Sequence, residues 1–167
     1  IDNLVIYEGD IILGPLVSFE GESKEKKRKY SYRWPNSTIP YVISAGHPMT
    51  TQINWAINHV NTNTNLCLVP RTNQSDYIQF INASGCASYV GRQGGRQDIT
   101  IGNCSQGSIA HEILHAAGLW HEQSREDRDN HIIIRWANIT AGKEHNFNKH
   151  VSDGTDIGAY DYGSIMH

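Results

Sequence analysis

The stretch HEILHAAGLWHE, residues 111–122, places three histidines and a glycine at fixed intervals. His111 and His115 are four residues apart, so on an α-helix their side chains lie on one face, one turn apart. Gly118 can adopt the left-handed backbone conformation that ends such a helix and turns the chain, which would bring His121 back toward the other two. Three neutral imidazoles leave a tetrahedral zinc ion one open position, as in catalytic rather than structural sites. The spacing therefore predicts a zinc site.

Glu112 adds a chemical group to this predicted site. Its place on the helix makes it a poor ligand for the same ion, but it can reach a water molecule, take its proton and later deliver that proton to a leaving amine. Zinc lowers the pKa of such a water and polarises a carbonyl. The pattern predicts metal-assisted hydrolysis of a peptide bond with Glu112 as general base. The other interpretation, an amphipathic helix with surface or core histidines, explains neither the third histidine nor the glutamate.

Length and composition set limits on the class of protein. The 167 residues suffice for one domain with a hydrophobic core. With 19% charged residues and a net charge of −3, the chain has no basic excess, so we expect no nucleic-acid partner. No apolar run reaches the length of a membrane span. The expected partners are protein or peptide substrates.

The hydrophobic periodicity predicts an α+β fold, a twisted mixed sheet with a backing helix and a zinc-site helix. A glycine-rich hairpin or loop is expected at 85–95, and the run of charged residues at 124–129 is interpreted as surface ion pairs. The expected strands are 38–44, 67–70, 77–81, 97–102 and 132–134, and the expected helices are 50–63, 108–118 and one within 137–148.

The N-terminal part of the chain is interpreted as an extension. Residues 1–23 contain turn residues and a short apolar run, too little for an independent fold. The basic run Lys24–Lys29 is a solvated linker in any interpretation, and an activating protease of the trypsin or furin type could cut there. We therefore expect a pro-segment over 1–29 and a catalytic domain over 30–167.

Cysteines and glycosylation sequons indicate the compartment. Cys67, Cys86 and Cys104 are odd in number, which implies a free thiol or a partner outside this chain. The residues from Ile1 show no basic start followed by a long apolar run, so no signal peptide is present, as in a cytosolic protein or one whose signal has been removed. Five N-x-Ser/Thr sequons fit a secretory route, and we expect a secreted protein; they lie at Asn36, Asn73, Asn82, Asn103 and Asn138.

Several motifs together resemble a known family. The pattern HExxHxxGxxH in residues 111–121 marks the metzincin metallopeptidases. Glu122 directly after the third histidine, with the charged residues up to Asp129, resembles the astacin branch of that group. The resemblance covers roughly residues 30–167 and includes IPYVI at 39–43, LVPRTNQSDYIQF at 68–80, GCASYVGR at 85–92 and SIMH at 164–167.

This resemblance implies an astacin-like fold whose cleft lies between two lobes. Met166 corresponds to the methionine of the Met-turn beneath the zinc, and Glu122 to the residue near which the new N-terminus is buried after activation. The family pattern has a tyrosine directly after Met-His, so we expect this chain, which stops at His167, to lack that tyrosine and most of the C-terminal lobe. His167 itself is not a zinc ligand in the pattern. Gln97–Gly102 would form the rim of the cleft and pair with extended substrate.

The resemblance also implies roles for the cysteines and the extension. Cys86 and Cys104 match a disulfide of the N-terminal lobe, and Cys67 matches a cysteine whose partner lies near the family's C-terminus, beyond this chain. Astacin pro-segments carry Phe-x-Gly-Asp, whose aspartate takes the open position on the zinc. The sequence Tyr7–Asp10 (YEGD) is similar, so we expect Asp10 to be an inhibitory zinc ligand and the chain to be a latent zymogen.

The sequence leaves two other functions open. A non-catalytic zinc-binding or adhesive domain derived from such a peptidase would have no need for Glu112. A small-molecule zinc hydrolase would explain neither Met166 nor the resemblance of Tyr7–Asp10 to a pro-segment.

Overall fold

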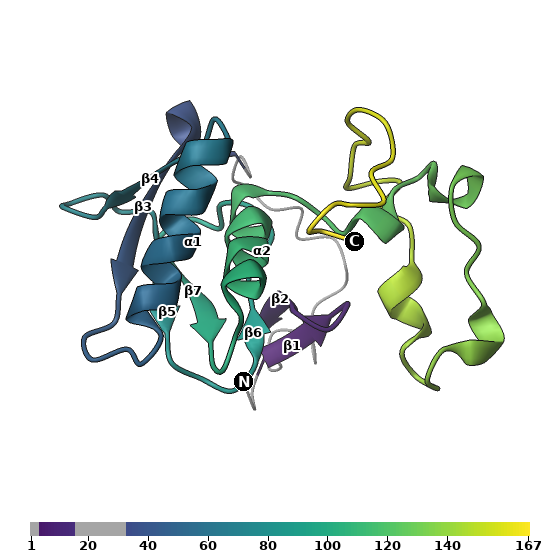
Figure 1. Cartoon of the computed structure of the whole chain (residues 1–167), viewed down its shortest axis with the longest axis horizontal. Helices are drawn as coiled ribbons and strands as arrows, with labels where there is room; N and C mark the ends of the chain where they lie inside the picture. The colour runs from purple at the N-terminus through teal and green to yellow at the C-terminus, as the bar shows by residue number, and fades with distance from the viewer. Residues whose placement is uncertain (1–3, 16–32) are drawn as a thin grey trace.

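A mixed β-sheet forms the base of the structure, a computed structural model that describes residues 4–15 and 33–167 (Figure 1). The predicted cleavage region Lys24–Lys29 lies outside the described residues. In the described part of the chain the main sheet has five strands in the order β4-β3-β5-β7-β6. β3, β4, β5 and β7 are parallel, and β6 runs antiparallel to β7. Their bounds are β3 Thr38–Ile43, β4 Cys67–Pro70, β5 Tyr77–Ile81, β6 Cys86–Ala87 and β7 Arg96–Ile101.

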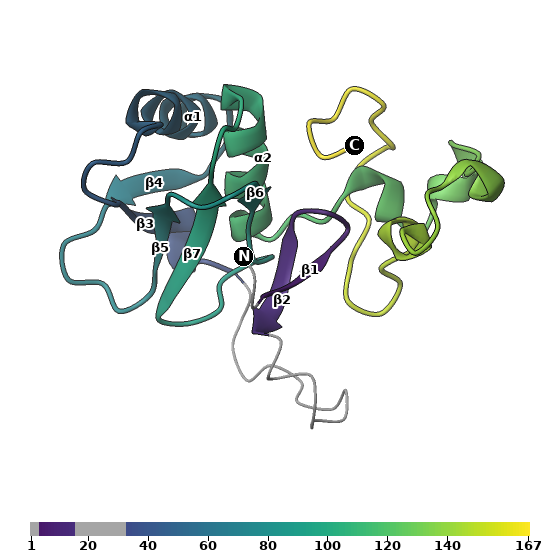
Figure 2. The same cartoon turned by 90° about the horizontal axis from the view of Figure 1, so that it is seen from below.

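Two α-helices of the described residues cover one face of this sheet, as Figure 2 shows. α1 spans Thr50–Asn63 and buries Ile53, Ala56, Ile57 and Val60, the spacing expected of an amphipathic helix. α2 spans Gln106–Ala117, beginning two residues earlier than predicted. The predicted α+β class and these two helices are confirmed. Neither helix is both long and apolar enough to cross a membrane.

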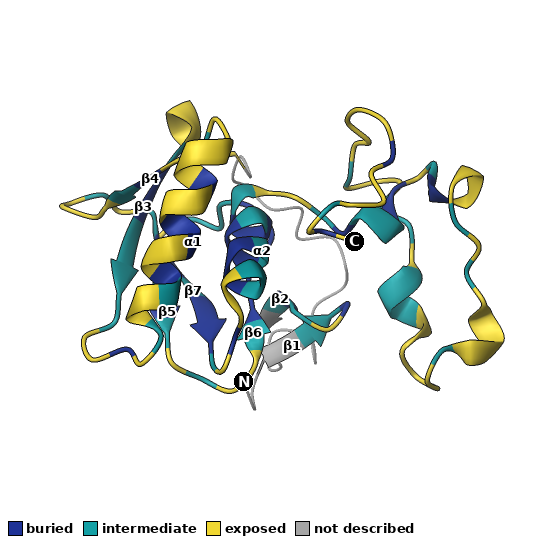
Figure 3. Ribbon diagram, viewed as in Figure 1, coloured by how far each residue is buried: buried dark blue, intermediate teal, exposed yellow. Residues whose placement is uncertain are grey.

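The hydrophobic core lies between the sheet and the two helices. Phe80 on β5, Ile99 on β7 and Ile113 on α2 are all fully buried there. Figure 3 shows the division along each helix, with buried residues toward the sheet and exposed residues on the outer side of α1. Trp34 joins the core from outside the sheet, and its indole donates a hydrogen bond of 2.8 Å to the carbonyl of Ala116. This packing holds α2 against the sheet.

The ends of α2 follow from its sequence. Ser105 is the N-cap, and its hydroxyl oxygen accepts a hydrogen bond of 3.0 Å from the backbone N–H of Ser108. Gly118 has a φ of 118°, the left-handed conformation that glycine adopts without steric cost, and its N–H returns to the carbonyls of Leu114 and His115. The turn predicted at this glycine is therefore present, and it redirects the chain toward His121.

The sequence prediction for the rim of the sheet was wrong. β7 was expected to offer a free edge, but it pairs with β5 on one side and with β6 on the other. β6 pairs with β7 at Thr100 and Ile101, so β7 is an inner strand of the described sheet and β6 forms the edge. Within the described sheet the edge next to the site is formed by β6 and continues to Ser88. A strand's neighbours depend on long-range pairing, which the local pattern of β7 does not specify.

The extension forms a hairpin against this edge. β1 (Leu4–Tyr7) pairs antiparallel with β2 (Ile11–Pro15). The backbone N–H of Ile12 donates to the carbonyl of Ser88 at 2.7 Å, and the N–H of Ser88 donates to the carbonyl of Asp10 at 2.9 Å. Figures 1 and 2 both place the hairpin between the sheet and residues 121–167. The extension is thus fastened to the domain by strand pairing.

Residues 121–167 contain short 3₁₀ turns and loops, and two predictions there were wrong. Residues 132–134 form no strand, and Ile133 is largely exposed, with no strand of the described chain paired to it. The helix expected within 137–148 is replaced by two short 3₁₀ turns, since Gly142, with a φ of 83°, interrupts the helical path. The 3₁₀ turns of the described chain are η2 Pro35–Ser37, η3 Glu122–Ser124, η4 Arg128–Asn130, η5 Trp136–Asn138 and η6 Glu144–Phe147.

The charged run at 124–129 contains the expected ion pairs, between Arg125 and Asp127 at 2.9 Å and between Arg128 and Asp129 at 2.6 Å. Their expected surface position is wrong for the arginines, because Arg125 and Arg128 are buried. Arg125 donates to the carbonyls of Ile157 and Gly158, and Arg128 donates to those of Gln123 and Phe147. Guanidinium groups have five donors, so they can satisfy several buried carbonyls at once. These arginines hold the loops together where regular secondary structure does not.

Gly102 offers a test of the packing beside the disulfide loop. A Cβ at this position would lie 2.5 Å from the carbonyl oxygen of Ala83 and 3.0 Å from the backbone nitrogen of Gly85, both of them backbone atoms. We expect Gly102→Ala to lower the free energy of unfolding by about 1–3 kcal/mol, because the backbone must shift. Gly107→Ala, in α2, should instead raise stability by about 0.5–1 kcal/mol, because a Cβ there would make only ordinary contacts with Ser105 at 3.8 Å and Ile165 at 3.9 Å. Urea unfolding of the two variants checks this, and equal effects would contradict it.

Candidate metal centre

The structure brings together the three histidines of residues 111–122. α2 presents His111 and His115 from successive turns, and the chain after Gly118 returns His121 to face them. The Nε2 atom of His121 lies 3.1 Å from Nε2 of His111 and 3.2 Å from Nε2 of His115. His115 and His121 are buried, and His111 is half-buried. Local helix geometry and one glycine turn account for this convergence.

The contacts of the Nδ1 atoms indicate which nitrogen of each imidazole carries the hydrogen. Nδ1 of His111 lies 2.7 Å from the carbonyl oxygen of Ile165, and Nδ1 of His115 lies 2.8 Å from that of Leu119. Nδ1 of His121 lies 2.6 Å from Oε2 of Glu8. Each of these acceptors requires a hydrogen on Nδ1, so in the neutral rings the Nε2 lone pairs face one another. Metal-binding histidines show this arrangement.

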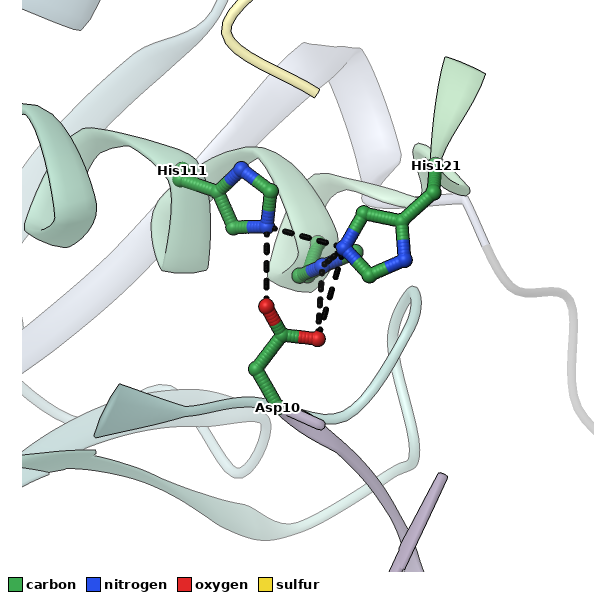
Figure 4. A group of neighbouring side chains, drawn as sticks. Asp10, His111 and His121 are labelled. Atoms are coloured by element: carbon green, nitrogen blue, oxygen red, sulfur yellow. Dashed lines mark hydrogen bonds and ion pairs between the residues drawn. The ribbon is translucent and has the colours of Figure 1, made fainter. Parts of the chain in front are cut away.

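Asp10 joins this group from the extension. Figure 4 shows its carboxylate pointing at the rings of His111 and His121. Oδ2 lies 3.2 Å from Nε2 of His111, and Oδ1 lies 3.3 Å from Nε2 of His121 and 3.7 Å from Nε2 of His115. Oδ1 is buried with no hydrogen-bond donor in the described part of the chain.

The four groups fit a tetrahedral ion in their spacing. Zinc binds imidazole nitrogen and carboxylate oxygen at about 2.0–2.1 Å, so two ligands of a tetrahedral ion lie about 3.3 Å apart. The atoms of Asp10, His111, His115 and His121 that could bind an ion lie within 4.8 Å of one another. Nε2 of His121 lies 3.1 and 3.2 Å from the other two ring nitrogens, and each oxygen of Asp10 lies 3.2–3.3 Å from one of the rings. Three nitrogens and one oxygen are donors that zinc accepts readily. The residues therefore suit a zinc ion.

The carboxylates of Asp10 and Glu8 favour positive charge between the histidines. Burial opposes ionisation of Asp10, but its contacts with His111, His115 and His121 outweigh burial and hold the pKa of its carboxyl well below the usual range. Burial would lower the pKa of His121, but the carboxylates of Asp10 and Glu8 raise it to about 9. A divalent cation would provide the charge that these two carboxylates favour.

Glu112 is buried beside the histidines. Its Oε2 atom has no hydrogen-bond donor among the described residues. Burial and the negative charge of Asp10 together raise the pKa of Glu112 to about 9, while His121 lowers it. A nearby cation reverses this effect, because positive charge favours the carboxylate. Glu112 is thus a buried carboxyl group with an unpartnered oxygen that interacts electrostatically with Asp10 and His121.

Glu8 is a second acidic residue of the extension at this site, and the sequence pattern did not identify it. Its side chain is fully buried, with a positive φ of 54° at the turn of the hairpin. Oε1 accepts hydrogen bonds from Ser124 at 2.8 Å and from His150 at 3.2 Å, and Oε2 accepts from His121. These donors outweigh burial and lower the pKa of Glu8. The sequence feature that could have identified Glu8 as a site residue is its position two residues before Asp10.

Aromatic contacts place Tyr7 and His150 beside this group. The ring of His150 stacks on Trp120 with 3.8 Å between ring centroids and meets Tyr7 edge-on at 5.9 Å. Tyr7 also contacts the ring of His145. The extension therefore contacts residues 120–150 through an aromatic ring and the carboxylate of Glu8.

The remaining predicted residues lie around the histidines. Met166 is buried, and its carbonyl accepts a hydrogen bond of 2.7 Å from the N–H of Glu122. The carboxylate of Glu122 accepts from the N–H of Asp161 at 2.9 Å and lies 3.5 Å from Arg125. His167 lies outside the cluster, 2.8 Å from the hydroxyl of Tyr160.

The cysteines divide as the resemblance implied. Cys86 on β6 and Cys104 before α2 form a disulfide that joins the sheet edge to the start of the helix. Cys67 is exposed and forms no disulfide with the described residues. The partner expected for Cys67 beyond this chain stays a prediction.

Comparison with known proteins agrees with this geometry. The chain matches the family model of the astacin peptidases over residues 26–167. Meprin A subunit beta of Rattus norvegicus is 41% identical over 172 residues, covering 98% of this chain, the extension included, and 23% of that protein. High choriolytic enzyme 1 of Oryzias latipes is 44% identical over 135 residues, covering 77% of this chain and 49% of that protein. The chain thus spans half or less of the length of these relatives.

A solved structure shows the same fold. It is that of high choriolytic enzyme 1, described as a hatching enzyme zinc-protease from the medaka fish Oryzias latipes. It superposes with a TM-score of 0.72 at 36% identity, covering 88% of this chain and 76% of that one. With this fold, the clustered histidines and the family match over most of its length, the chain belongs to the astacin family of peptidases.

Proposed function

We propose that this chain is the catalytic part of a secreted zinc-dependent endopeptidase in its latent form. The convergence of three imidazole Nε2 atoms on one carboxylate, at spacings suited to a tetrahedral ion, carries the proposal. Each imidazole donates its other nitrogen to an oxygen acceptor, as metal-binding histidines do. His111, His115 and His121 would hold the ion in both the latent and the processed protein.

The chemistry assigned to the chain's own residues is peptide hydrolysis. When bound, zinc would lower the pKa of a water molecule and polarise the scissile carbonyl. Glu112 takes a proton from the water while the oxygen of the water attacks the carbonyl carbon. Glu112 then gives that proton to the leaving amine as the C–N bond breaks. Its unpartnered, buried Oε2 supports this assignment. The turn that contains Met166 supports the ligand His111, because the carbonyl of Ile165 in this turn accepts a hydrogen bond from Nδ1 of His111.

Substrate is proposed to bind along the free edge of β6. Ser88 uses its N–H and its carbonyl to pair with the extension at Asp10 and Ile12. Once the extension leaves, these groups are available to pair with an extended peptide as an added strand. The expected substrates are proteins or peptides, because such pairing requires a polypeptide backbone.

Latency is assigned to residues 1–29, and catalysis to residues 30–167. Asp10 occupies the position that a water molecule would need, and β2 covers the edge at Ser88. Cutting near Lys24–Lys29 by an activating protease would release both. The new N-terminus would then approach Glu122, whose carboxylate in the latent form is held by the backbone of Asp161 and by Arg125.

Secretion is supported by two observations. The disulfide Cys86–Cys104 requires an oxidising compartment. All five sequon asparagines are exposed, as glycosylation requires, at positions 36, 73, 82, 103 and 138.

Metal removal separates this proposal from a non-catalytic zinc-binding domain. The full-length protein that contains this chain is cut in the basic region, and a quenched peptide is assayed with and without chelator. We expect activity to fall in proportion to the zinc removed and to return when zinc is added, because Glu112 alone does not make water a sufficient nucleophile. A processed protein that binds zinc but never cleaves peptides would favour the binding domain.

A further inference from the structure

We propose that Glu8 positions the zinc ligand His121, so that the extension strengthens metal binding as well as blocking the site. The inference rests on the proposed zinc site. Glu8 does not touch the ion position; its Oε2 accepts a hydrogen bond of 2.6 Å from Nδ1 of His121, on the ring side away from Nε2. The extension therefore contacts this imidazole from both sides, with Asp10 at Nε2 and Glu8 at Nδ1.

The three histidines differ in where their outer partners come from. Nδ1 of His111 donates to the backbone of Ile165, and Nδ1 of His115 to the backbone of Leu119. Both acceptors belong to the proposed catalytic domain and remain after processing. His121 alone among the three has a partner in the extension, 113 residues away in the sequence. Removal of the extension would leave this one ligand without its acceptor.

The acceptor of the His121 hydrogen bond is a carboxylate, and this affects how well His121 binds a metal ion. A carboxylate is a stronger acceptor than a backbone carbonyl, and it makes the imidazole a more basic and better-oriented ligand. The side chain of Glu8 is fully buried, and its hydrogen bonds come from His121, Ser124 and His150 rather than from a lysine or an arginine. A buried carboxylate is costly unless positive charge lies nearby. A metal ion behind His121 would supply that charge, so Glu8 and the ion should stabilise each other.

The latent form should therefore bind zinc with a higher affinity than its four direct ligands alone would give. Asp10 contributes as a direct ligand, and Glu8 contributes through His121. Changing outer partners of metal-binding histidines typically weakens metal affinity about 10- to 100-fold. We expect a loss in that range for Glu8→Gln in the unprocessed protein, because glutamine keeps the shape and an acceptor oxygen but removes the charge.

The experiment measures zinc affinity of the unprocessed full-length protein by competition with a chromogenic chelator. Ser124→Ala is the matched variant, because it removes the other buried hydrogen bond to Glu8 and leaves the bond to His121. Glu126→Gln, at an exposed glutamate, controls for charge alone. We expect Ser124→Ala and Glu126→Gln to change affinity less than about threefold. With cobalt in place of zinc, Glu8→Gln should also shift the visible absorption of the metal, as a changed ligand does.

Processing provides an internal control. After cleavage and separation of the extension, the wild-type and Glu8→Gln proteins have the same sequence, so their zinc affinities should become equal. If the wild-type protein binds zinc but Glu8→Gln matches it within twofold, the inference is overturned while the proposed function stands. Equal losses in Glu8→Gln and Ser124→Ala, or a difference that persists after processing, would also overturn it. Failure of the wild-type protein to bind zinc would instead contradict the proposed function.

Discussion

Replacing Glu112 by glutamine in the processed full-length protein is expected to lower kcat/KM on a quenched peptide by about 100- to 10,000-fold, the range that general acid–base catalysis contributes. The glutamine side chain has nearly the same volume, but it cannot accept a proton at neutral pH. Zinc should remain bound, because the histidine ligands are unchanged and Glu112 is not one of the groups that surround the ion position. Peptide hydrolysis and zinc content are measured on the same sample.

Glu126→Gln is the control for this substitution, since Glu126 is an exposed glutamate outside the cluster. It should leave both kcat/KM and zinc content unchanged. A Glu112→Gln protein that is fully loaded with zinc and as active as wild type would exclude Glu112 as the general base. Loss of zinc together with activity would show that Glu112 acts on the metal site, and would equally contradict the assignment.

Replacing Asp10 by alanine is expected to make the uncut full-length protein active. The carboxylate that faces the three imidazoles would be lost, and the closed form would lose about 3 kcal/mol, the low end of what removing one partner of a buried charged pair costs. That free energy corresponds to about a hundredfold gain in the open fraction, and hence in peptide hydrolysis by uncleaved protein. The hairpin would still be held at Ser88, so activity should stay below that of the processed enzyme.

Two controls accompany the Asp10 variant. Asp129→Asn removes an exposed carboxylate that is not part of the cluster and should leave the uncut protein inactive. The double variant Asp10→Ala/Glu112→Gln should also be inactive, which excludes a contaminating protease. Uncut Asp10→Ala protein with no more activity than wild type would count against Asp10 as the group that blocks the site.

Local sequence patterns predicted the elements whose stability is local. The apolar spacing in α1, from Ile53 to Val60, and the alternation in β5 correspond to faces that the structure buries. Predictions were wrong where distant contacts decide the conformation. Residues 132–148 are fastened at Phe147, whose carbonyl accepts a hydrogen bond from the buried Arg128, so the periodicity of the segment itself carried little information.

What the sequence by itself determined is the metal cluster of residues 111–122. A spacing of four residues places His111 and His115 on one helix face, and a glycine that adopts positive φ returns His121, so the geometry follows from local backbone rules. The tertiary structure decided the rest of the site. It placed Glu8 against His121, made β6 rather than β7 the free edge, and buried Arg125 and Arg128. These features join segments far apart in the chain, and such contacts depend on how the whole fold packs rather than on any local pattern.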